Sequence, residues 1–181
     1  MVSFEDVVNN EEVKELIKNA QKQLDVLGYT EHSTRHVSVV AERAADVLKT
    51  LGYDEHRIEL ARIAGYMHDI GNLVNRKDHA QSGALMAWSI LNDMGCDAGE
   101  LATIVTAIGN HDEGTGVPVN AVAAAMILAD KADVRRSRVR NTDISTFDIH
   151  DRVNYSVTES SLRINAEQTQ VLLELTVDTE F

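Results

Sequence analysis

The segment YMHDIGN, residues 66–72, places His68 directly before Asp69 at the end of an apolar run. Neutral imidazole and carboxylate side chains are the groups that bind divalent transition metals in proteins. Because the two residues are neighbours, both can reach one ion, and the second carboxylate oxygen of Asp69 can bridge to another. Unpaired polar groups in an apolar run cost free energy. We therefore interpret His68 and Asp69 as a metal-binding and catalytic pair.

Four further side chains of the same kind lie on or at the ends of predicted helices: His36, His79, His111 and Asp130. Alone, His36 could be a surface residue and His79 a helix cap. Asp130 alone could pair with Lys131 or Arg135. Taken together, six such residues suit two metal ions ~3.5 to 4 Å apart, which can hold a bridging hydroxide and stabilise a phosphorus centre.

The spacing of apolar residues indicates the helices that would carry these side chains. Apolar stripes predict helices at about residues 9–27, 34–51, 55–70, 79–94, 101–108 and 119–134. Asn9 or Asn10 is expected to cap the first helix and Asp54 the third. The third is apolar on nearly every side in its second half, which is typical of a central helix.

Beyond Ile149 the apolar period changes to two, which favours strands. Val153, Tyr155 and Val157 alternate in one run, VLLELTV alternates in a second, and NAEQTQ between them has turn chemistry. The predicted fold is mainly α, a helical bundle at residues 1–150 followed by a C-terminal β-hairpin at residues 151–181. Because edge strands pair readily, the hairpin is expected to form a homodimer or to act as a lid.

The order and intervals of five motifs resemble the HD superfamily of metal-dependent phosphohydrolases. The motifs are His36, MHDIG, DHAQSGA, GNHDE and ILADKAD, and the resemblance covers about residues 30–140. It is to the two-metal branch, which includes the HD-type diadenosine tetraphosphate hydrolases and, more weakly, the HD-GYP phosphodiesterases. It implies an HD-type helical bundle and two divalent transition metal ions, Fe or Mn, with Co, Ni or Zn as alternatives.

Carried over to this sequence, the resemblance assigns the first ion to His36, His68, Asp69 and Asp130. It assigns the second ion to Asp69 as a bridge, with His79 and His111. Gly83, one turn after His79, would leave room beside the site.

Phosphate binding is expected from cationic residues. The segment ADKADVRRSRV resembles one in the diadenosine tetraphosphate hydrolases, which makes Arg135, Arg136 and Arg138 candidates to hold substrate phosphates. Many relatives have a phosphate-facing lysine two residues after HDI, where this chain has Asn72. Arg76 or Lys77 would then take its place.

The HD-GYP pattern fits less well. Those proteins read HHE before a longer loop, whereas this chain has Asn110, His111 and Asp112 and a shorter GTGVP segment. Asn110 is a poor metal ligand, which argues against a third ion.

The function expected from this reading is hydrolysis of a phosphoester or phosphoanhydride of a small nucleotide-type substrate by a metal-bound hydroxide. Asp112 and Glu113 are candidate proton shuttles, and His32 and His56 are expected at the surface. Cys96 has no evident histidine partner, so a catalytic thiol is not expected. Two alternatives stay open: a one-metal HD nucleotidase in which His79 and His111 take no part, and a non-catalytic HD-type ligand-sensing module.

Composition limits the partners. Apolar residues make up 44% of the 181-residue chain and charged residues 25%, as in an ordinary globular protein. The net charge of -12 argues against binding a nucleic-acid polymer. A single cysteine, no signal-peptide pattern at the start and no membrane-length apolar run lead us to expect a cytoplasmic protein that does not bind membranes.

Overall fold

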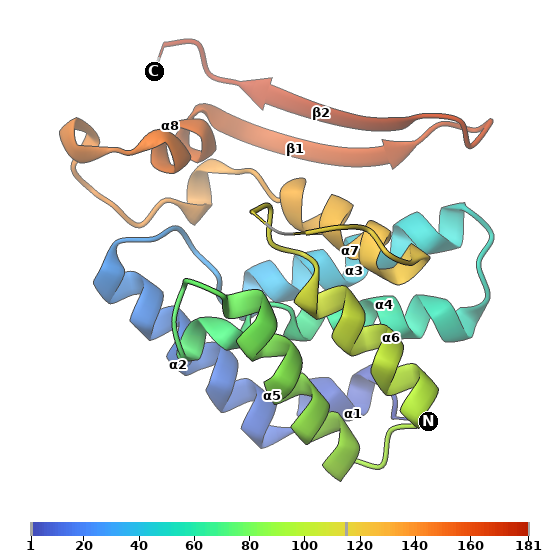
Figure 1. Cartoon of the computed structure of the whole chain (residues 1–181). Coiled ribbons are helices and arrows are strands. Elements are labelled where there is room, and N and C mark those ends of the chain that lie inside the picture. The colour runs from blue at the N-terminus through green and yellow to red at the C-terminus, as the bar shows by residue number, and fades with distance from the viewer. Residues whose placement is uncertain (1, 115, 181) are drawn as a thin grey trace.

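The computed structural model describes residues 2–114 and 116–180 as helices joined by short loops, with one hairpin across them (Figure 1). Three residues lie outside the described part of the chain: Met1, Thr115 and Phe181. Met1 and Phe181 are the outer bounds of the two predicted domains, and Thr115 belongs to the loop at residues 111–118. The α-helices are α1 (Phe4–Asn9), α2 (Glu11–Leu27), α3 (Thr34–Thr50), α4 (Glu55–Met67), α5 (His79–Asp93), α6 (Ala98–Gly109), α7 (Ala121–Lys131) and α8 (Ile149–Ser156). Three short 3-10 helices are η1 (Ile70–Leu73), η2 (Arg136–Arg138) and η3 (Ile144–Thr146). The strands are β1 (Val157–Ile164) and β2 (Val171–Val177).

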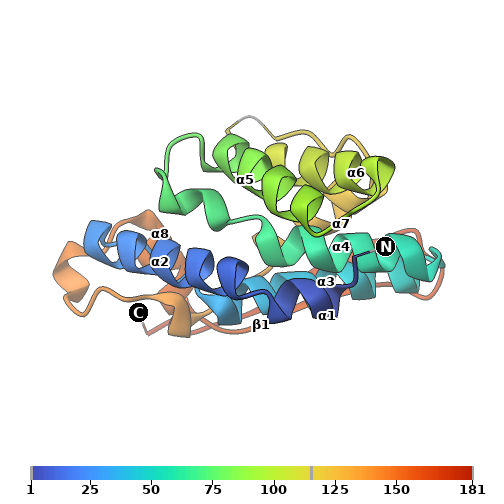
Figure 2. The ribbon, with the colours of Figure 1, turned by 90° about the horizontal axis from the view of Figure 1, so that it is seen from below.

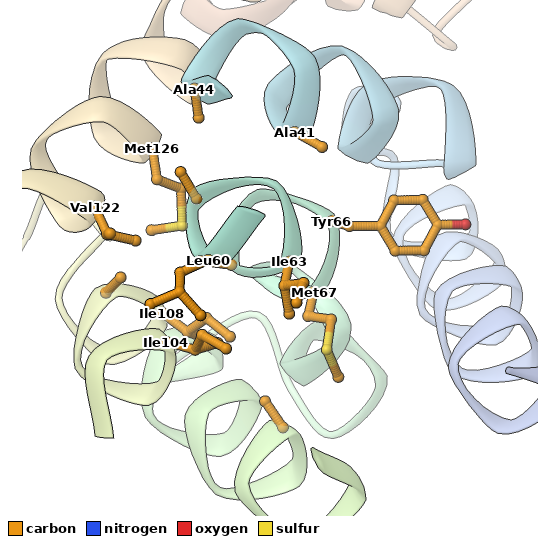
Figure 3. Packing of buried hydrophobic residues seen from close by; sticks show 14 of the residues in the cluster. Ala41, Ala44, Leu60, Ile63, Tyr66, Met67, Ile104, Ile108, Val122 and Met126 are labelled. Atoms are coloured by element: carbon orange, nitrogen blue, oxygen red, sulfur yellow. The ribbon is translucent and has the colours of Figure 1, made fainter. Parts of the chain in front are cut away.

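The helix α4 occupies the centre of the bundle, as its all-round apolar pattern predicts. It packs against α3, α6 and α7, and Figure 2 shows α5 and α6 on one side of it and α1 and α2 on the other. Leu60 and Met67 of α4 are buried, and Figure 3 shows them within the apolar cluster that also contains Ile104, Ile108 and Met126. This packing fixes the end of α4, where the chain reaches His68.

Capping side chains set the helix starts. Asn10 accepts hydrogen bonds from two backbone N–H groups of α2, and Asp54 accepts one from Arg57 of α4, so both predicted caps are confirmed. The first predicted helix is preceded by the separate helix α1. The helix predicted at 119–134 ends at Lys131, and the basic segment RRSRVR therefore lies outside it.

The hairpin prediction is correct for β2 and wrong at the start of β1. Val153 and Tyr155 lie in α8, because Asp148 caps a helix there by accepting a hydrogen bond from the N–H of Asp151. The two strands pair antiparallel, with Val157 opposite Val177 and Ile164 opposite Val171. The strand β2 is exposed along its whole length, and whether a second copy of the chain covers it stays a prediction.

The fold class, mainly α with a C-terminal β-hairpin, is confirmed. The boundary predicted at residue 150 falls inside α8. Within the described residues, no helix is both long and apolar enough to cross a membrane.

Candidate metal centre

Three helices bring the first group of predicted ligands together. His36 lies in α3, His68 and Asp69 follow α4, and Asp130 lies near the end of α7. The Nε2 atom of His36 lies 3.5 Å from Oδ2 of Asp69 and 3.3 Å from Oδ1 of Asp130. The Nε2 atom of His68 lies 3.2 Å and 3.7 Å from the same two oxygens. The two nitrogens and two oxygens therefore face a common point.

The second group lies on the other side of Asp69. The Nε2 atom of His79, at the start of α5, is 3.6 Å from Oδ1 of Asp69 and 3.0 Å from Nε2 of His111. Potential ligand atoms of His68, Asp69 and His111 all lie within 4.8 Å of one another. Because Oδ2 of Asp69 faces the first group and Oδ1 faces the second, this carboxylate has the geometry of a bridge.

The four imidazole rings are all held through their Nδ1 atoms. Each Nδ1 has one protein acceptor: Asp133 Oδ2 for His36 (2.7 Å), Gly65 O for His68 (2.8 Å), Arg76 O for His79 (3.0 Å) and Ile108 O for His111 (2.7 Å). A proton on Nδ1 satisfies each acceptor and leaves the Nε2 lone pair directed at the centre. Histidine ligands of metals in proteins are usually fixed in this way.

The buried polar atoms at this point fit a metal ion. Among the described residues, His36 Nε2, His68 Nε2 and Asp69 Oδ2 are buried and have no hydrogen-bond partner. Buried polar atoms are nearly always paired, because leaving them unpaired is costly. A set of imidazole nitrogens and carboxylate oxygens suits a divalent transition metal.

Proton affinities at the centre reflect the same crowding of negative charge. Burial lowers the pKa of His68 when taken alone, but the nearby carboxylates of Asp69 and Asp130 raise it to about 10. Burial lowers the pKa of His111 to about 4. Burial raises the pKa of Asp69, but the charge of His68 holds it well below its usual range. Without a metal, a proton on His68 thus offsets the buried carboxylates.

Asp133 is a site residue that the sequence reading missed. It is fully buried, and besides His36 it binds Arg135, whose Nε donates to Asp133 Oδ1 at 2.8 Å. The only sequence signal for it is a second aspartate three residues after Asp130.

His32, predicted at the surface, is buried instead. Its Nδ1 lies 2.7 Å from the carbonyl oxygen of Thr30, and its ring centroid lies 5.4 Å from that of His36. Backbone pairing explains the burial, because the N–H of Glu31 donates to the carbonyl of Arg138 at 2.7 Å and holds the segment against the protein. His56 is exposed as predicted, with Nε2 2.7 Å from Glu100 Oε1.

The residues near HDIGN differ in their position relative to the centre. Asn72 is buried, and its Nδ2 donates to Asp69 Oδ1 at 2.7 Å, so it positions the carboxylate. Nη1 of Arg76 lies 3.2 Å from Asn72 Oδ1 and 3.9 Å from Asp69 Oδ1. Lys77 is exposed at the rim of the adjoining cavity.

The arginines of the RRSRVR segment are held by protein groups. Arg135 binds Asp133 and Glu31, Arg136 binds Asp178 and the carbonyl of Tyr155, and Arg138 binds the carbonyl oxygens of Glu31 and Asp133. Of the three, Arg138 lines the cavity. Their phosphate-binding role stays a prediction. Arg135 and Arg138 contact Asp133, which in turn holds His36.

The resemblance implied that Gly83 leaves room beside the site, but the structure shows close backbone contacts there instead. A Cβ on Gly83 would lie 3.2 Å from the carbonyl oxygen of His68 and 3.2 Å from the nitrogen of Gly71. A Cβ on Gly71 would lie 2.0 Å from the carbonyl oxygen of His79. The two glycines therefore let α5 contact the turn after Asp69, which brings His79 to the centre.

A cavity of about 800 Å³ opens beside the centre. Asp69, His79, His111 and Asp130 line it, with His32 next to them. The remaining wall comes from the loop after α2, the segment before α5, the loop after α6, the end of α7 with the segment that follows it, and α8. This volume is in the range of cavities that bind small molecules.

Comparison with known proteins supports the resemblance to HD-domain proteins. The HD domain model matches residues 29–148. The chain is 26% identical over 160 residues to the uncharacterized protein MJ1020 of Methanocaldococcus jannaschii; the match covers 76% of this chain and 61% of that protein's length. It also superposes on the crystal structure of a predicted HD superfamily hydrolase from an uncultured Thermotogales bacterium, with a TM-score of 0.55, 24% identity, and coverage of 79% of this chain and 81% of the other.

Proposed function

Because the chain belongs to the HD domain family, we propose that it is a metal-dependent phosphohydrolase that cleaves a phosphoester or phosphoanhydride of a small nucleotide-type substrate. The observation that carries the proposal is the set of three buried, unpartnered ligand atoms, His36 Nε2, His68 Nε2 and Asp69 Oδ2. Both nitrogens lie 3.2–3.5 Å from Asp69 Oδ2 without forming a hydrogen bond, whereas buried polar atoms are nearly always hydrogen-bonded. Their state is that of a ligand set prepared for an ion.

Two ions are proposed rather than one. His36, His68 and Asp130 form one possible ligand group and His68, Asp69 and His111 form another. Asp69 presents one oxygen to each side, and the ring of His79 approaches its Oδ1. Divalent ions at these positions would supply an activated water and neutralise phosphate charge.

The residues around the centre would orient the phosphate. Arg76 lies beside Asp69 and His79 and lines the cavity. Lys131 lines it as well, with its Nζ shared between Glu113 and Asp130. These cations would hold the non-bridging oxygens of the phosphate at the reacting end through charge-assisted hydrogen bonds.

A nucleotide is proposed because the cavity is larger than a phosphate requires. At about 800 Å³ it can accept a base and a ribose. The ring of Tyr29, with the guanidinium carbon of Arg76 5.9 Å from its centroid, is part of the wall and offers an aromatic surface.

A metal-supplemented substrate screen tests the proposal. The metal-free chain is loaded separately with Mn, Fe, Co, Ni or Zn and assayed against nucleoside monophosphates, dinucleoside polyphosphates and cyclic dinucleotides. We expect turnover that is lost in Asp69→Asn and retained in His56→Asn, because His56 is exposed and paired only with Glu100. Metal binding without turnover on any phosphate substrate would overturn the proposal and favour the ligand-sensing alternative.

A further inference from the structure

The short helix α8 forms a wall of the cavity beside the metal centre. It begins at Ile149, just beyond the residues matched by the HD domain model. Its side chains and that of its capping residue, Asp148, line the cavity together with metal-centre residues. Figure 1 shows α8 near the C-terminal end of α2, on the side where the segment joining η1 to α5 also lies. This wall is therefore a feature of this chain outside the matched region.

Asp151 of α8 is buried but poorly satisfied. Only 4% of its surface is exposed, and it lines the cavity. Its Oδ2 accepts one long hydrogen bond, 3.4 Å from Nδ2 of Asn141, and within the described part of the chain its Oδ1 accepts none. No described lysine, arginine or histidine forms an ion pair with it. Oδ1 of Asp151 is not one of the buried atoms left without a partner, and the residue lines the cavity, so a ligand in the cavity can donate a hydrogen bond to this carboxylate.

The neighbouring acid does not share this property. Asp148 uses Oδ1 to accept the backbone N–H of Asp151 at 2.8 Å, and its side chain is exposed. Asp151 is therefore the buried carboxylate on this wall, whereas Asp148 is a solvated helix cap.

The charges that line the cavity are divided. Arg76 and Lys131 lie beside the metal ligands Asp69 and Asp130. The helix α8 contributes His150, Asp151 and Asn154 to the lining, and no lysine or arginine. A ligand that satisfies both regions carries a phosphate at one end and N–H donors at the other. We propose, building on the proposed function, that Asp151 forms a base-recognition subsite for a guanine nucleotide.

Guanine fits this acceptor best among the common bases. Its N1–H and N2–H groups lie side by side and can donate to the two oxygens of one carboxylate. Adenine has an acceptor beside its amino group, and hypoxanthine lacks the second donor. An alkyl ammonium group would also satisfy Asp151, but it would leave most of the ~800 Å³ cavity and the ring of Tyr29 without contact.

The test uses ligands that contain no phosphate, so that base recognition is measured apart from catalysis. Guanosine, inosine, adenosine, 1-methylguanosine and ethanolamine are titrated into the metal-loaded full chain, with binding followed by calorimetry or ligand-detected NMR. We expect guanosine to bind at least about 10-fold more tightly than adenosine or 1-methylguanosine, with inosine between, because each lost hydrogen bond to a charged group has a cost of that order.

Two variants complete the experiment. Asp151→Asn should reduce the preference for guanosine over adenosine to within about 2-fold, because the amide replaces one acceptor by a donor. Asp143→Asn is the matched control, because Asp143 is exposed, caps η3 and is not part of the cavity lining, and it should keep the preference.

The outcomes separate this inference from the proposed function. Equal binding of guanosine and 1-methylguanosine to the unmodified chain, or tighter binding of ethanolamine, would overturn the guanine subsite even if Asp151→Asn did not fold. Guanosine preference that depends on Asp151, without hydrolysis of any phosphate substrate, would support the subsite and count against the phosphohydrolase. Hydrolysis that does not depend on the base and is unchanged in Asp151→Asn would support the phosphohydrolase and contradict the guanine subsite.

Discussion

Nδ1 of His36 lies 2.7 Å from Oδ2 of Asp133, although 97 positions separate these two fully buried residues. The aspartate is itself fixed, because Arg135 donates from Nε to its Oδ1. This link orients the imidazole so that Nε2 points at Asp69 and Asp130. A carboxylate behind a histidine ligand also raises the basicity of the ligand.

Replacing Asp133 should therefore weaken metal binding without removing a ligand. In Asp133→Asn the acceptor is neutral, and we expect affinity for the first ion to fall by about 10- to 100-fold. Competition with a chelator of known affinity measures the change, and circular dichroism checks the fold. Asp143→Asn is the control on an exposed aspartate. Unchanged metal affinity would show that the His36 orientation does not depend on Asp133.

The number of ions per chain should depend on His79 and His111. Their Nε2 atoms meet at 3.0 Å on the Oδ1 side of Asp69, away from His36. We expect two ions per chain, and one after His79→Ala or His111→Ala, by elemental analysis after dialysis. A constant content of one ion in all three proteins would favour the one-metal nucleotidase.

The stability of the metal-free chain should fall as pH rises above neutrality. The pKa of His68 is raised from 6.5 to about 10 in the folded chain, since Asp69 and Asp130 outweigh the effect of burial. Its proton therefore stabilises the folded state fully below pH 6.5, and this contribution is lost as pH rises through 10. His32 and His111, with pKa values lowered to about 3 and about 4, destabilise only as pH falls below 6.5.

Differential scanning calorimetry between pH 7 and 10 measures the Tm of the chain, once with a chelator present and once with added Mn. The decrease in Tm should be smaller with the metal, because the ion takes the place of the proton. His68→Asn should show a smaller decrease in the metal-free chain. An equally steep decrease in that variant would assign the pH dependence to other groups.

Gly71→Ala should disturb the second ligand group. Its Cβ would lie 2.0 Å from the carbonyl oxygen of His79 and 2.4 Å from the nitrogen of Gly83, and both are backbone atoms that cannot turn aside. We expect a loss of unfolding free energy of roughly 1–3 kcal/mol or more, as for overpacking. We also expect reduced occupancy of the second ion. Gly109→Ala is the control, because its Cβ would make an ordinary contact of 3.5 Å with Ala84. Equal stability of the two variants would show that α5 tolerates displacement from the turn.

The helices, and the residues that the fold brings together as candidate ligands, could be predicted from the sequence because their signals are local or repeated. Apolar periodicity and the caps Asn10 and Asp54 mark the helices. The ligands His68 and Asp69 are adjacent in an apolar run, where unpaired polar groups need an explanation.

Other features depend on distant contacts. The burial of His32 requires the Glu31 backbone to pair with Arg138, and the role of Asp133 requires a partner 97 positions away. Val153 and Tyr155 alternate like strand residues, but they lie in α8, where the decisive signal is Asp148, which caps the helix. Alternation over three residues fits a short helix as well as a strand, so a cap has to decide between them.

Arg76 should contribute to catalysis more than its neighbour Lys77. Its Nη1 lies 3.3 Å from Nε2 of His79 and 3.9 Å from Oδ1 of Asp69, so it reaches the reacting end of the cavity, whereas Lys77 is exposed at the rim. With the best substrate of the screen, we expect Arg76→Ala to lower kcat/KM by about 100-fold, because a charged contact to phosphate of ~3 kcal/mol is lost. Lys77→Ala should lower it by less than about 5-fold, since exposed charges contribute little. Metal content is measured in both variants, because loss of an ion from Arg76→Ala would assign the effect to the metal centre. Equal effects of the two substitutions would show that only the general positive charge at this rim matters.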